Sequence, residues 1–325
     1  MKTFFSKKAI LLSSALAIAA TGCSSPAIRL SGAGASFPAQ IYTSWFKDLS
    51  EDGDISVNYQ AVGSGSGRKA FIDETVDFAA SDDPMKDSDI ALVDRGLVQI
   101  PMVGGTIAFG YNYDCDLKLT QEDAVKVAMG IITDWKELGC PPGQITWVHR
   151  SDGSGTTKAF TASMDAFSRL WTLGVGKSVE WVTGVGGKGN SGVAGIIETT
   201  YGAIGYVNQS YIRGNITAAA LENREGQFVY PTAESGAIAL NGIKLDDNLA
   251  GRDPNPRGDG AYPISTLTWI LAYETGNGEN TEAIKEMLSA LLSDEYQAKA
   301  ITLDFIPLKG DILERAREAI NLIKE

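Results

Sequence analysis

A glycine-rich turn between a strand-like run and a helix-like run constrains the fold of this chain most, because the same arrangement occurs three times. The clearest copy spans residues 149–157, His-Arg-Ser-Asp-Gly-Ser-Gly-Thr-Thr, between the β-type run 145–148 and an amphipathic helical run over 158–170. The other two turns lie at 34–37 and 63–67, each before a helical pattern. Strands that alternate with helices predict an α/β fold.

A turn of this kind is suited to bind an anion. The first N–H groups of a helix have no partner within the helix, and the helix dipole places its positive end there. Ser154 and Thr156 add hydroxyl donors, while Gly155 lets the backbone approach a ligand closely. Arg150 supplies a planar, permanently charged fork, and Asp152 is close enough in sequence to hold it. An ordinary capped turn is the alternative for this stretch alone, but three converging helix starts would offer one small oxyanion many donors.

Two further features bear on such a site. The short apolar strand 76–80 ends in Ser81-Asp82-Asp83-Pro84, and open α/β sheets place their ligand sites at strand ends. Taken alone, these two carboxylates are typical of a turn. Two strand-like runs, 98–101 and 106–113, flank Gly104-Gly105, which is a candidate hinge. The length of 325 residues allows two domains or one large one.

Composition and motif searches exclude several functions. The net charge of -12 argues against general nucleic-acid binding, which needs a basic surface. Gly187-Lys188-Gly189 fails the P-loop pattern, because a glycine follows the lysine and the upstream glycine spacing is wrong. His149 is the only histidine, and the chain has no HExxH, GxSxG or His-rich metal-binding spacing. The usual residues for nucleophilic or metal catalysis are therefore missing. We expect a non-enzymatic protein without cofactor or metal, with His149 at the surface or at the edge of a cleft.

Residues 1–22 have the pattern of a signal peptide. Three lysines form a basic start, and the apolar run 9–20 is too short for a comfortable membrane span. The small residues before Cys23 resemble a bacterial lipobox, so we expect Cys23 to be lipidated and residues 23–29 to form a tether. Ordinary secretory cleavage nearby is the alternative. Removal of the signal peptide takes away three lysines and no acidic residue, which changes the net charge from -12 to -15.

Cys115 and Cys140 are the cysteines that follow Cys23 in the chain. An even pair of cysteines in an oxidising compartment is a candidate disulfide, and two free thiols are the alternative. Neither cysteine belongs to a CxxC motif or has a histidine partner, so we expect no metal site at this pair.

Five motifs occur in an order and spacing that resemble one known family. They are GAGASFP at 32–38, YQAVGSGSG at 59–67, ASDDP at 80–84, RSDGSGT at 150–156 and GGKGN at 186–190. With Tyr262-Pro263-Ile264-Ser265, they make the chain similar, from about residue 30 to the C-terminus, to the periplasmic phosphate-binding protein of the phosphate-specific ABC transporter. Each motif alone is weak, but their shared order is highly specific.

The resemblance implies a hinged, two-lobed periplasmic binding protein fold of type II, with the ligand in the inter-domain cleft. Lobe I would hold residues 27–103 and 262–325, and lobe II residues 104–261. The resemblance also implies a monomeric, non-catalytic receptor, lipid-anchored in the periplasm, that binds inorganic phosphate and delivers it to an inner-membrane ABC permease. A receptor for another tetrahedral oxyanion is the nearest alternative, and an exported phosphatase is the enzymatic one.

Residue by residue, the resemblance also implies the phosphate contacts. They are Ser36, Phe37 (through its N–H), Ser64, Asp82, Arg150, Ser154, Gly155 and Thr156, with Asp152 paired to Arg150. The sequence departs from the family pattern at Ser36, where relatives often carry threonine, and at His149, where a second arginine is common. The first change keeps the hydroxyl, and the second removes a fixed charge near the cleft. Asp82 would accept the proton that phosphate still carries and would reject sulfate, which is fully ionised.

Overall fold

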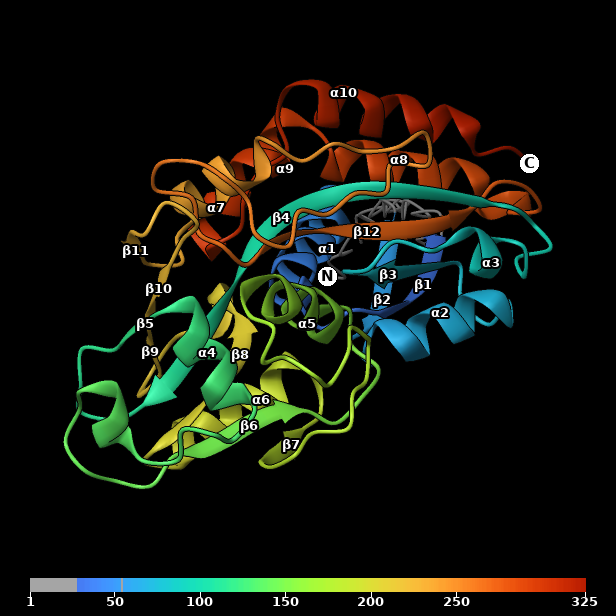
Figure 1. Ribbon diagram of the computed structural model, residues 1–325. Helices are drawn as coiled ribbons and strands as arrows, with labels where there is room; N and C mark the ends of the chain where they lie inside the picture. Colours follow the sequence, from blue (N-terminus) through green and yellow to red (C-terminus); the bar gives the residue numbers. More distant parts are fainter. Residues whose placement is uncertain (1–27, 54) are drawn as a thin grey trace, which may run out of the picture.

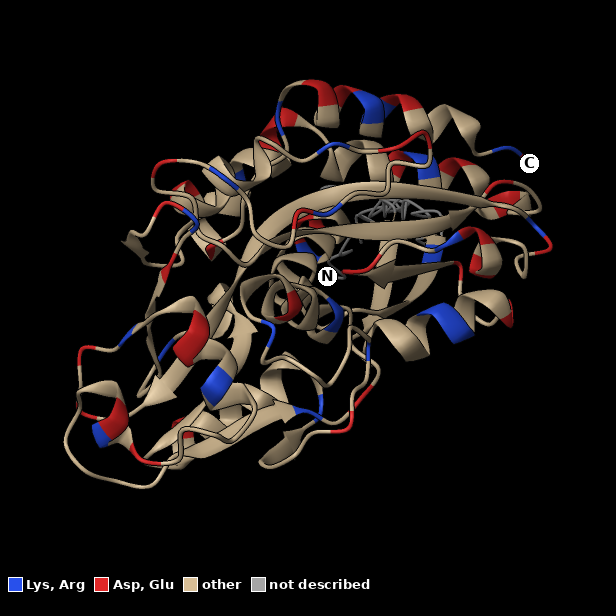
Figure 2. Ribbon diagram, in the orientation of Figure 1, with Lys and Arg blue, Asp and Glu red and all other residues tan. Residues whose placement is uncertain are grey.

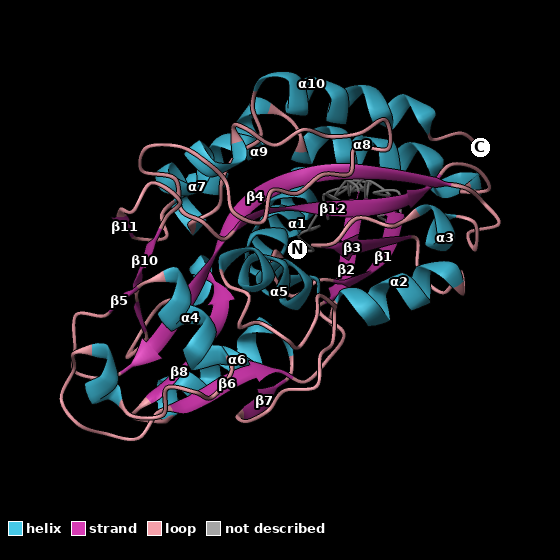
Figure 3. Cartoon of the chain, in the orientation of Figure 1, coloured by secondary structure: helices cyan, strands magenta, loops and turns pink. Residues whose placement is uncertain are grey.

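The chain folds into two lobes joined through one long strand (Figure 1). The computed structural model describes residues 28–53 and 55–325. The predicted signal peptide, Cys23 and most of the predicted tether lie outside the described residues. The main sheet has the strand order β2-β1-β3-β12-β4-β8-β6-β7, with β9 paired to β4, and a second sheet has the order β11-β10-β5. Figure 3 shows helices packed around the strands of both lobes, which is the α/β architecture that the sequence predicts.

The strands run in chain order as follows: β1 (Ile28–Gly34), β2 (Ile55–Gln60), β3 (Phe78–Ser81), β4 (Leu97–Asn112), β5 (Lys118–Leu119), β6 (Thr146–Arg150), β7 (Val185–Gly187), β8 (Ala203–Asn208), β9 (Thr217–Ala218), β10 (Ala220–Glu222), β11 (Phe228–Val229) and β12 (Ser265–Tyr273). Strands β1, β2 and β3 are parallel, β12 is antiparallel to β3 and β4, and β6, β7 and β8 are parallel. The predicted strands 76–80 and 145–148 therefore correspond to β3 and β6.

The helices are α1 (Ala39–Asp52), α2 (Ser64–Ile72), α3 (Asp87–Ile90), α4 (Gln121–Ala128), α5 (Gly155–Phe167), α6 (Gly189–Thr199), α7 (Ala233–Leu240), α8 (Thr281–Leu291), α9 (Asp294–Ala300) and α10 (Gly310–Ala319). Short 3₁₀ segments include η1 (Trp135–Leu138) and η2 (Gln209–Tyr211). None of the helices in the described part of the chain is both long and apolar enough to cross a membrane.

Strand β4 belongs to both lobes. Its residues 97–106 pair with β12 in the first lobe, and its residues 107–112 pair with β8 in the second. The sequence predicts two strands around Gly104-Gly105, and this is wrong, because the strand is continuous. The glycines serve close packing instead: a Cβ on Gly104 would lie 2.3 Å from Leu240, and one on Gly105 would lie 2.7 Å from the Phe37 ring. The pairing partner thus changes shortly after the candidate hinge.

The first lobe is built around an aromatic core. Helix α1 places Ile41, Trp45, Phe46 and Leu49 on its buried face, as their helical spacing predicts. Helices α1 and α8 pack on each other and on β2 and β1, while α2 packs on β1 and β3. This packing anchors the helix starts to the ends of the strands that precede them.

Helix α2 begins earlier than the sequence indicates. The glycine-serine run 63–67 reads as a turn before the helix, but α2 starts at Ser64 and includes the last two glycines of the run. A Cβ on Gly67 would lie 2.4 Å from the Cα of Gly34 in β1. The helix therefore lies so close to the strand that only glycine fits, although glycine is a poor helix former.

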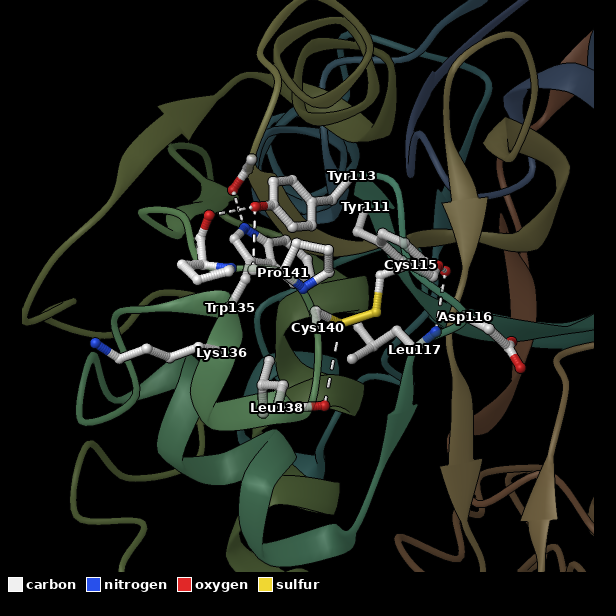
Figure 4. The surroundings of a disulfide bond; sticks show 12 residues. Tyr111, Tyr113, Cys115, Asp116, Leu117, Trp135, Lys136, Leu138, Cys140 and Pro141 are labelled. Carbon is white, nitrogen blue, oxygen red and sulfur yellow. Dashed lines mark hydrogen bonds between the residues drawn. A yellow bond between two sulfur atoms is a disulfide. The ribbon is translucent and has the colours of Figure 1, made fainter.

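Cys115 and Cys140 form a disulfide in the second lobe (Figure 4), with their Cα atoms 5.7 Å apart. It lies beside Tyr111 and Trp135, which pack against each other. The bond ties the segment after β4 to the segment after η1, in a part of the lobe without long secondary structure.

Loss of this disulfide is expected to lower the free energy of unfolding by about 3.5 kcal/mol in the chain-entropy model, given the 25-residue separation. The double variant Cys115→Ser, Cys140→Ser should unfold at lower urea concentration than the parent protein, and reductant should have the same effect on the parent. Reductant should not move the unfolding midpoint of the variant, which serves as the control. An unchanged midpoint in the double variant would contradict the prediction.

Candidate anion-binding site

The three glycine-rich turns meet at one place, since the Gly63 N–H before α2 donates to the carbonyl oxygen of Gly34 at 2.8 Å and α2 contacts the turn before α5. The Gly65 N–H of α2 donates to the carbonyl oxygen of Gly153 across the interface, at 2.8 Å. The Gly155 N–H at the start of α5 donates to the Ser64 hydroxyl, at 3.1 Å. The starts of α2 and α5 therefore lie side by side, although the two bonded residues are 91 positions apart in the sequence.

Glycine at two positions makes this approach possible. Gly63 has φ +92, a conformation that side-chain-bearing residues rarely adopt, and a Cβ there would lie 2.1 Å from the Asp152 carboxylate. A Cβ on Gly155 would lie 2.7 Å from the Ser64 hydroxyl and 2.8 Å from the Asp82 nitrogen. Both glycines thus keep the two lobes in direct contact at the site.

Ser154 is the N-cap of α5. Its hydroxyl oxygen accepts a hydrogen bond from the Thr157 N–H at 3.0 Å, which satisfies one of the unpaired donors of the first turn. Because the oxygen acts as the acceptor, the Ser154 hydroxyl still has its own proton to donate. Ser154, Gly155 and Thr156 are all buried.

Arg150 lies at the end of β6 and is held by Asp152. The Arg150 Nε donates to one carboxylate oxygen at 2.7 Å, and a terminal guanidinium nitrogen donates to the other at 2.5 Å. The Arg150 side chain is 1% exposed. Burial acts to raise the pKa of Asp152, but the hydrogen bond and charge of Arg150 outweigh it, so the pKa lies below its usual value. The pair is therefore ionised at neutral pH, and its other guanidinium nitrogen, 3.4 Å from the Thr156 hydroxyl, faces the site.

Asp82 lies at the end of β3, where the sequence places it. It is fully enclosed, and its carboxylate oxygens accept hydrogen bonds from Thr268 at 3.0 Å and from Thr156 at 3.1 Å. Burial raises the pKa of Asp82 to about 6, while these two hydroxyls and the charge of Arg150 oppose the rise. Asp82 is therefore a buried hydrogen-bond acceptor among donors, and it changes charge just below neutral pH.

The first lobe supplies the remaining predicted phosphate contacts, which are Ser36, Phe37 and Ser64. The Ser36 hydroxyl oxygen accepts from the backbone N–H of Asn190 at 2.9 Å and from its side-chain amide at 3.1 Å, so its proton is free to donate. The Phe37 ring is buried, and its backbone N–H donates to no other described residue. The predicted contacts are thus brought together from both lobes.

Several residues at the site are not predicted from the sequence. Asn190 also donates to Thr156 at 3.1 Å, and Arg252 donates to the backbone oxygen of Asp82 at 2.8 Å. Asn190 lies within one of the motifs that carry the family resemblance, so a signal for it was present. Arg252 lies in a stretch that looks irregular, and Thr268 lies in the middle of an apolar strand, so the sequence gives no signal for either.

His149 is half-buried and turned toward Trp181. Its imidazole stacks on the indole ring, with the ring centroids 4.9 Å apart. Burial lowers the pKa of His149, so the ring is neutral at neutral pH. Neighbouring residues of a strand point to opposite faces, so His149 points away from the face of β6 that carries Arg150.

Fold and site together define a class of protein: a two-lobed α/β binding protein with a donor-rich, buried site between its lobes. The domain model described as "PBP superfamily domain" matches residues 20–295. The chain belongs to this superfamily and, within it, to the family of the PstS phosphate-binding proteins.

Two relatives illustrate the family membership. The phosphate-binding protein PstS of Pasteurella multocida is 35% identical over 329 residues, which cover 95% of this chain and 94% of that protein. The phosphate-binding protein PstS of Haemophilus influenzae is 37% identical over 304 residues, which cover 87% and 90%.

Solved structures share the fold at lower identity. A high-affinity periplasmic phosphate-binding protein, PfluDING, solved with bound phosphate, has a TM-score of 0.78 at 20% identity and covers 90% of this chain and 93% of its own. A phosphate ABC transporter substrate-binding protein from Clostridium perfringens has a TM-score of 0.67 at 21% identity and covers 86% and 100%. These structures support the two-lobed fold.

Proposed function

We propose that this protein is a non-catalytic receptor that binds inorganic phosphate and delivers it to an ABC-type phosphate permease. The observation that carries the proposal is the meeting of helix starts from both lobes around the buried Arg150, with Asp82 as the acceptor among them. The PstS relatives, which are named for phosphate binding, support the same ligand.

The proposed contacts are those that the family resemblance implies: Ser36, Phe37 through its N–H, Ser64, Asp82, Arg150, Ser154, Gly155 and Thr156, with Asp152 holding Arg150. A tetrahedral oxyanion that is stripped of water needs several donors to each of its oxygens. Hydroxyls, backbone N–H groups at helix starts and one guanidinium supply them. The overall charge is -12, and acidic residues are spread over both lobes (Figure 2). Attraction of the anion therefore depends on local dipoles and on Arg150.

The single acceptor favours phosphate over other oxyanions. At neutral pH phosphate carries at least one proton, which can be donated to the ionised Asp82. A fully ionised oxyanion would meet the carboxylate with lone pairs on both sides, which is repulsive. A receptor for another tetrahedral oxyanion remains the second candidate, because the same donors suit any anion of this shape.

Transport would follow from closure of the lobes. We place lobe I at residues 27–103 and 262–325 and lobe II at residues 104–261, so that the ligand contacts come from both. A ligand that binds both lobes shifts the population toward the closed form, which the permease would then recognise. We place the protein in the periplasm as a monomer, with a lipid anchor on Cys23.

Calorimetric titration of the mature protein with phosphate, sulfate and arsenate at neutral pH tests the proposal. We expect tight one-to-one binding of phosphate and no heat with sulfate. Sulfate binding as strong as that of phosphate would move the protein to another oxyanion. A folded protein that binds none of the three would refute the receptor function.

A further inference from the structure

The Asp82 carboxylate accepts hydrogen bonds from two threonines, one from each lobe. Thr156 at the start of α5 donates to one carboxylate oxygen, and Thr268 in the middle of β12 donates to the other. All three side chains are enclosed, with at most 1% of each residue exposed. A carboxylate oxygen can accept two hydrogen bonds, so each oxygen keeps a lone pair for a ligand. Thr268 is not among the residues that the family resemblance implies.

The sheet fixes Thr268 next to Asp82. In the antiparallel pairing of β12 with β3, Trp269 lies opposite Ser81, so Thr268 comes beside the residue that follows. On its other side, the pairing of β12 with β4 shifts register between Thr268 and Trp269. Irregularities of this kind re-aim a side chain and are frequent next to functional sites.

The two threonines differ in when they can act. Asp82 directly follows β3, and Thr268 lies in β12, the neighbouring strand of the same sheet in the first lobe. Their hydrogen bond therefore does not depend on how the lobes sit. Thr156 comes from the second lobe, so its bond to Asp82 forms only when the lobes close. Before closure, Thr268 is therefore the hydroxyl that holds the carboxylate.

We infer that Thr268 orients the Asp82 carboxylate as an acceptor before the lobes close, and that it thereby sets the preference for an oxyanion that still carries a proton. This inference rests on the proposed function and adds a specificity-determining residue to it. Thr268 acts through Asp82 and is a positioning residue.

The charges around Asp82 agree with this role. Burial raises the pKa of Asp82, and the Thr268 hydroxyl is the strongest of the influences that lower it. The other titratable or charged groups that face Asp82 are Arg150 from β6, Arg252 from the loop 241–264, Tyr42 from α1, Tyr59 from β2 and Tyr211 from η2. The three tyrosines have raised pKa values and are neutral, so apart from the two arginines only the threonine hydroxyls favour the ionised carboxylate.

The test replaces Thr268 by valine, which has the same shape but no hydroxyl. We expect the ratio of sulfate to phosphate dissociation constants to fall by at least about tenfold at neutral pH, because a hydrogen bond to a charged group is lost. Without the hydroxyl, the pKa of Asp82 rises, so the pH below which sulfate begins to bind should move upward. Titration calorimetry with both anions between about pH 5 and pH 8, a range that includes the pKa of about 6 that burial gives Asp82, measures both effects.

Matched variants separate this role from a structural one. Thr266→Val makes the same substitution on the same strand at a threonine whose hydroxyl bonds to the Leu267 carbonyl, so anion preference should stay unchanged. Thr268→Ser should keep the wild-type ratio, since it keeps the hydroxyl. If the valine variant does not fold, Thr268→Cys, with a weak donor of similar size, should show the same loss against the serine variant.

The results of these experiments distinguish a failure of the inference from a failure of the proposed function. If the unmodified protein binds phosphate but Thr268→Val keeps its anion ratio and pH profile, the inference is wrong and the receptor function stands. If the unmodified protein binds no phosphate, the proposed function fails first, and the inference falls with it.

Discussion

The variant Arg150→Ala is expected to bind phosphate about a thousandfold more weakly than the parent protein, the largest loss from any one side chain at the site. Truncating one member of a buried, hydrogen-bonded charge pair at a binding site costs about 2–5 kcal/mol, and each 1.4 kcal/mol is tenfold in affinity. The Arg150 side chain is almost fully enclosed, and the guanidinium nitrogen that does not bond to Asp152 donates to the Thr156 hydroxyl and faces the site. Titration calorimetry with phosphate measures the loss.

Stability must be separated from binding in this experiment. Arg150→Ala leaves Asp152 as a buried carboxylate without its partner, which by itself destabilises a fold by about 3–5 kcal/mol. The double variant Arg150→Met, Asp152→Asn removes both charges, so we expect it to regain most of the stability and none of the phosphate affinity. The amide oxygen of the new asparagine can still accept the hydrogen bond that the Gly189 N–H gives to the Asp152 carboxylate at 3.0 Å. Recovery of binding in the double variant would show that the charge of Arg150 is dispensable.

A matched arginine elsewhere provides the control. Arg317 also pairs with an aspartate, Asp294, and its guanidinium donates to the Leu292 carbonyl. It lies in the C-terminal helix α10, which contributes no residue to the site. Arg317→Ala should weaken the fold slightly and leave phosphate affinity unchanged.

Parts of the site that depend on short stretches of sequence could be predicted. Arg150 and Asp152 are two residues apart, so their ion pair follows from local sequence. Ser154 caps α5 in the same way, because a cap bonds to a residue three positions on. The position of Asp82 at a strand end followed from a short apolar run bounded by turn residues.

Contacts that depend on the register of distant segments could not be predicted. Thr268 reaches Asp82, 186 positions away in the sequence, only because β12 pairs with β3 with Trp269 opposite Ser81. Arg252 reaches the same residue from a loop without a secondary-structure signal. Similarly, Gly104-Gly105 reads as an interruption, because the sequence does not show that the Phe37 ring and Leu240 press against the strand there.

The variant Asp82→Asn is expected to lose most of the preference for phosphate over sulfate. The asparagine amide can donate to an oxyanion but cannot be the charged acceptor for the phosphate proton, so phosphate affinity should fall by about 10- to 100-fold. Sulfate, which no longer meets a negative charge, should bind. Competition calorimetry with the two anions at neutral pH measures both changes. Wild-type phosphate affinity with sulfate still excluded would end the role given to Asp82.

The pH dependence gives the same prediction a second measurement. Burial raises the pKa of Asp82 to about 6 in the folded protein, above the usual value of an aspartate. The ionised carboxylate therefore destabilises the fold at neutral pH, and this cost shrinks as the pH falls from about 6 toward the usual aspartate pKa of about 3.9, because only the folded state binds the proton in this range. Without ligand, Asp82→Asn should therefore be at least as stable as the parent protein at neutral pH. Sulfate binding by the variant should not change between about pH 7 and pH 5. The parent, in contrast, should begin to bind sulfate as the pH falls below about 6.

A neighbouring carboxylate shows whether position or charge matters. Asp83 is also buried, but its carboxylate pairs with Arg68 at 3.0 Å and lies 3.6 Å from Arg252, away from the hydroxyls that surround Asp82. Asp83→Asn removes the same charge one residue further along the chain. Because the acceptor that faces the donors of both lobes is intact in this variant, it should still exclude sulfate at neutral pH, even where the weakened arginine pairing lowers its stability. If Asp83→Asn admits sulfate as readily as Asp82→Asn, selectivity comes from the net charge near the site and not from the acceptor geometry of Asp82.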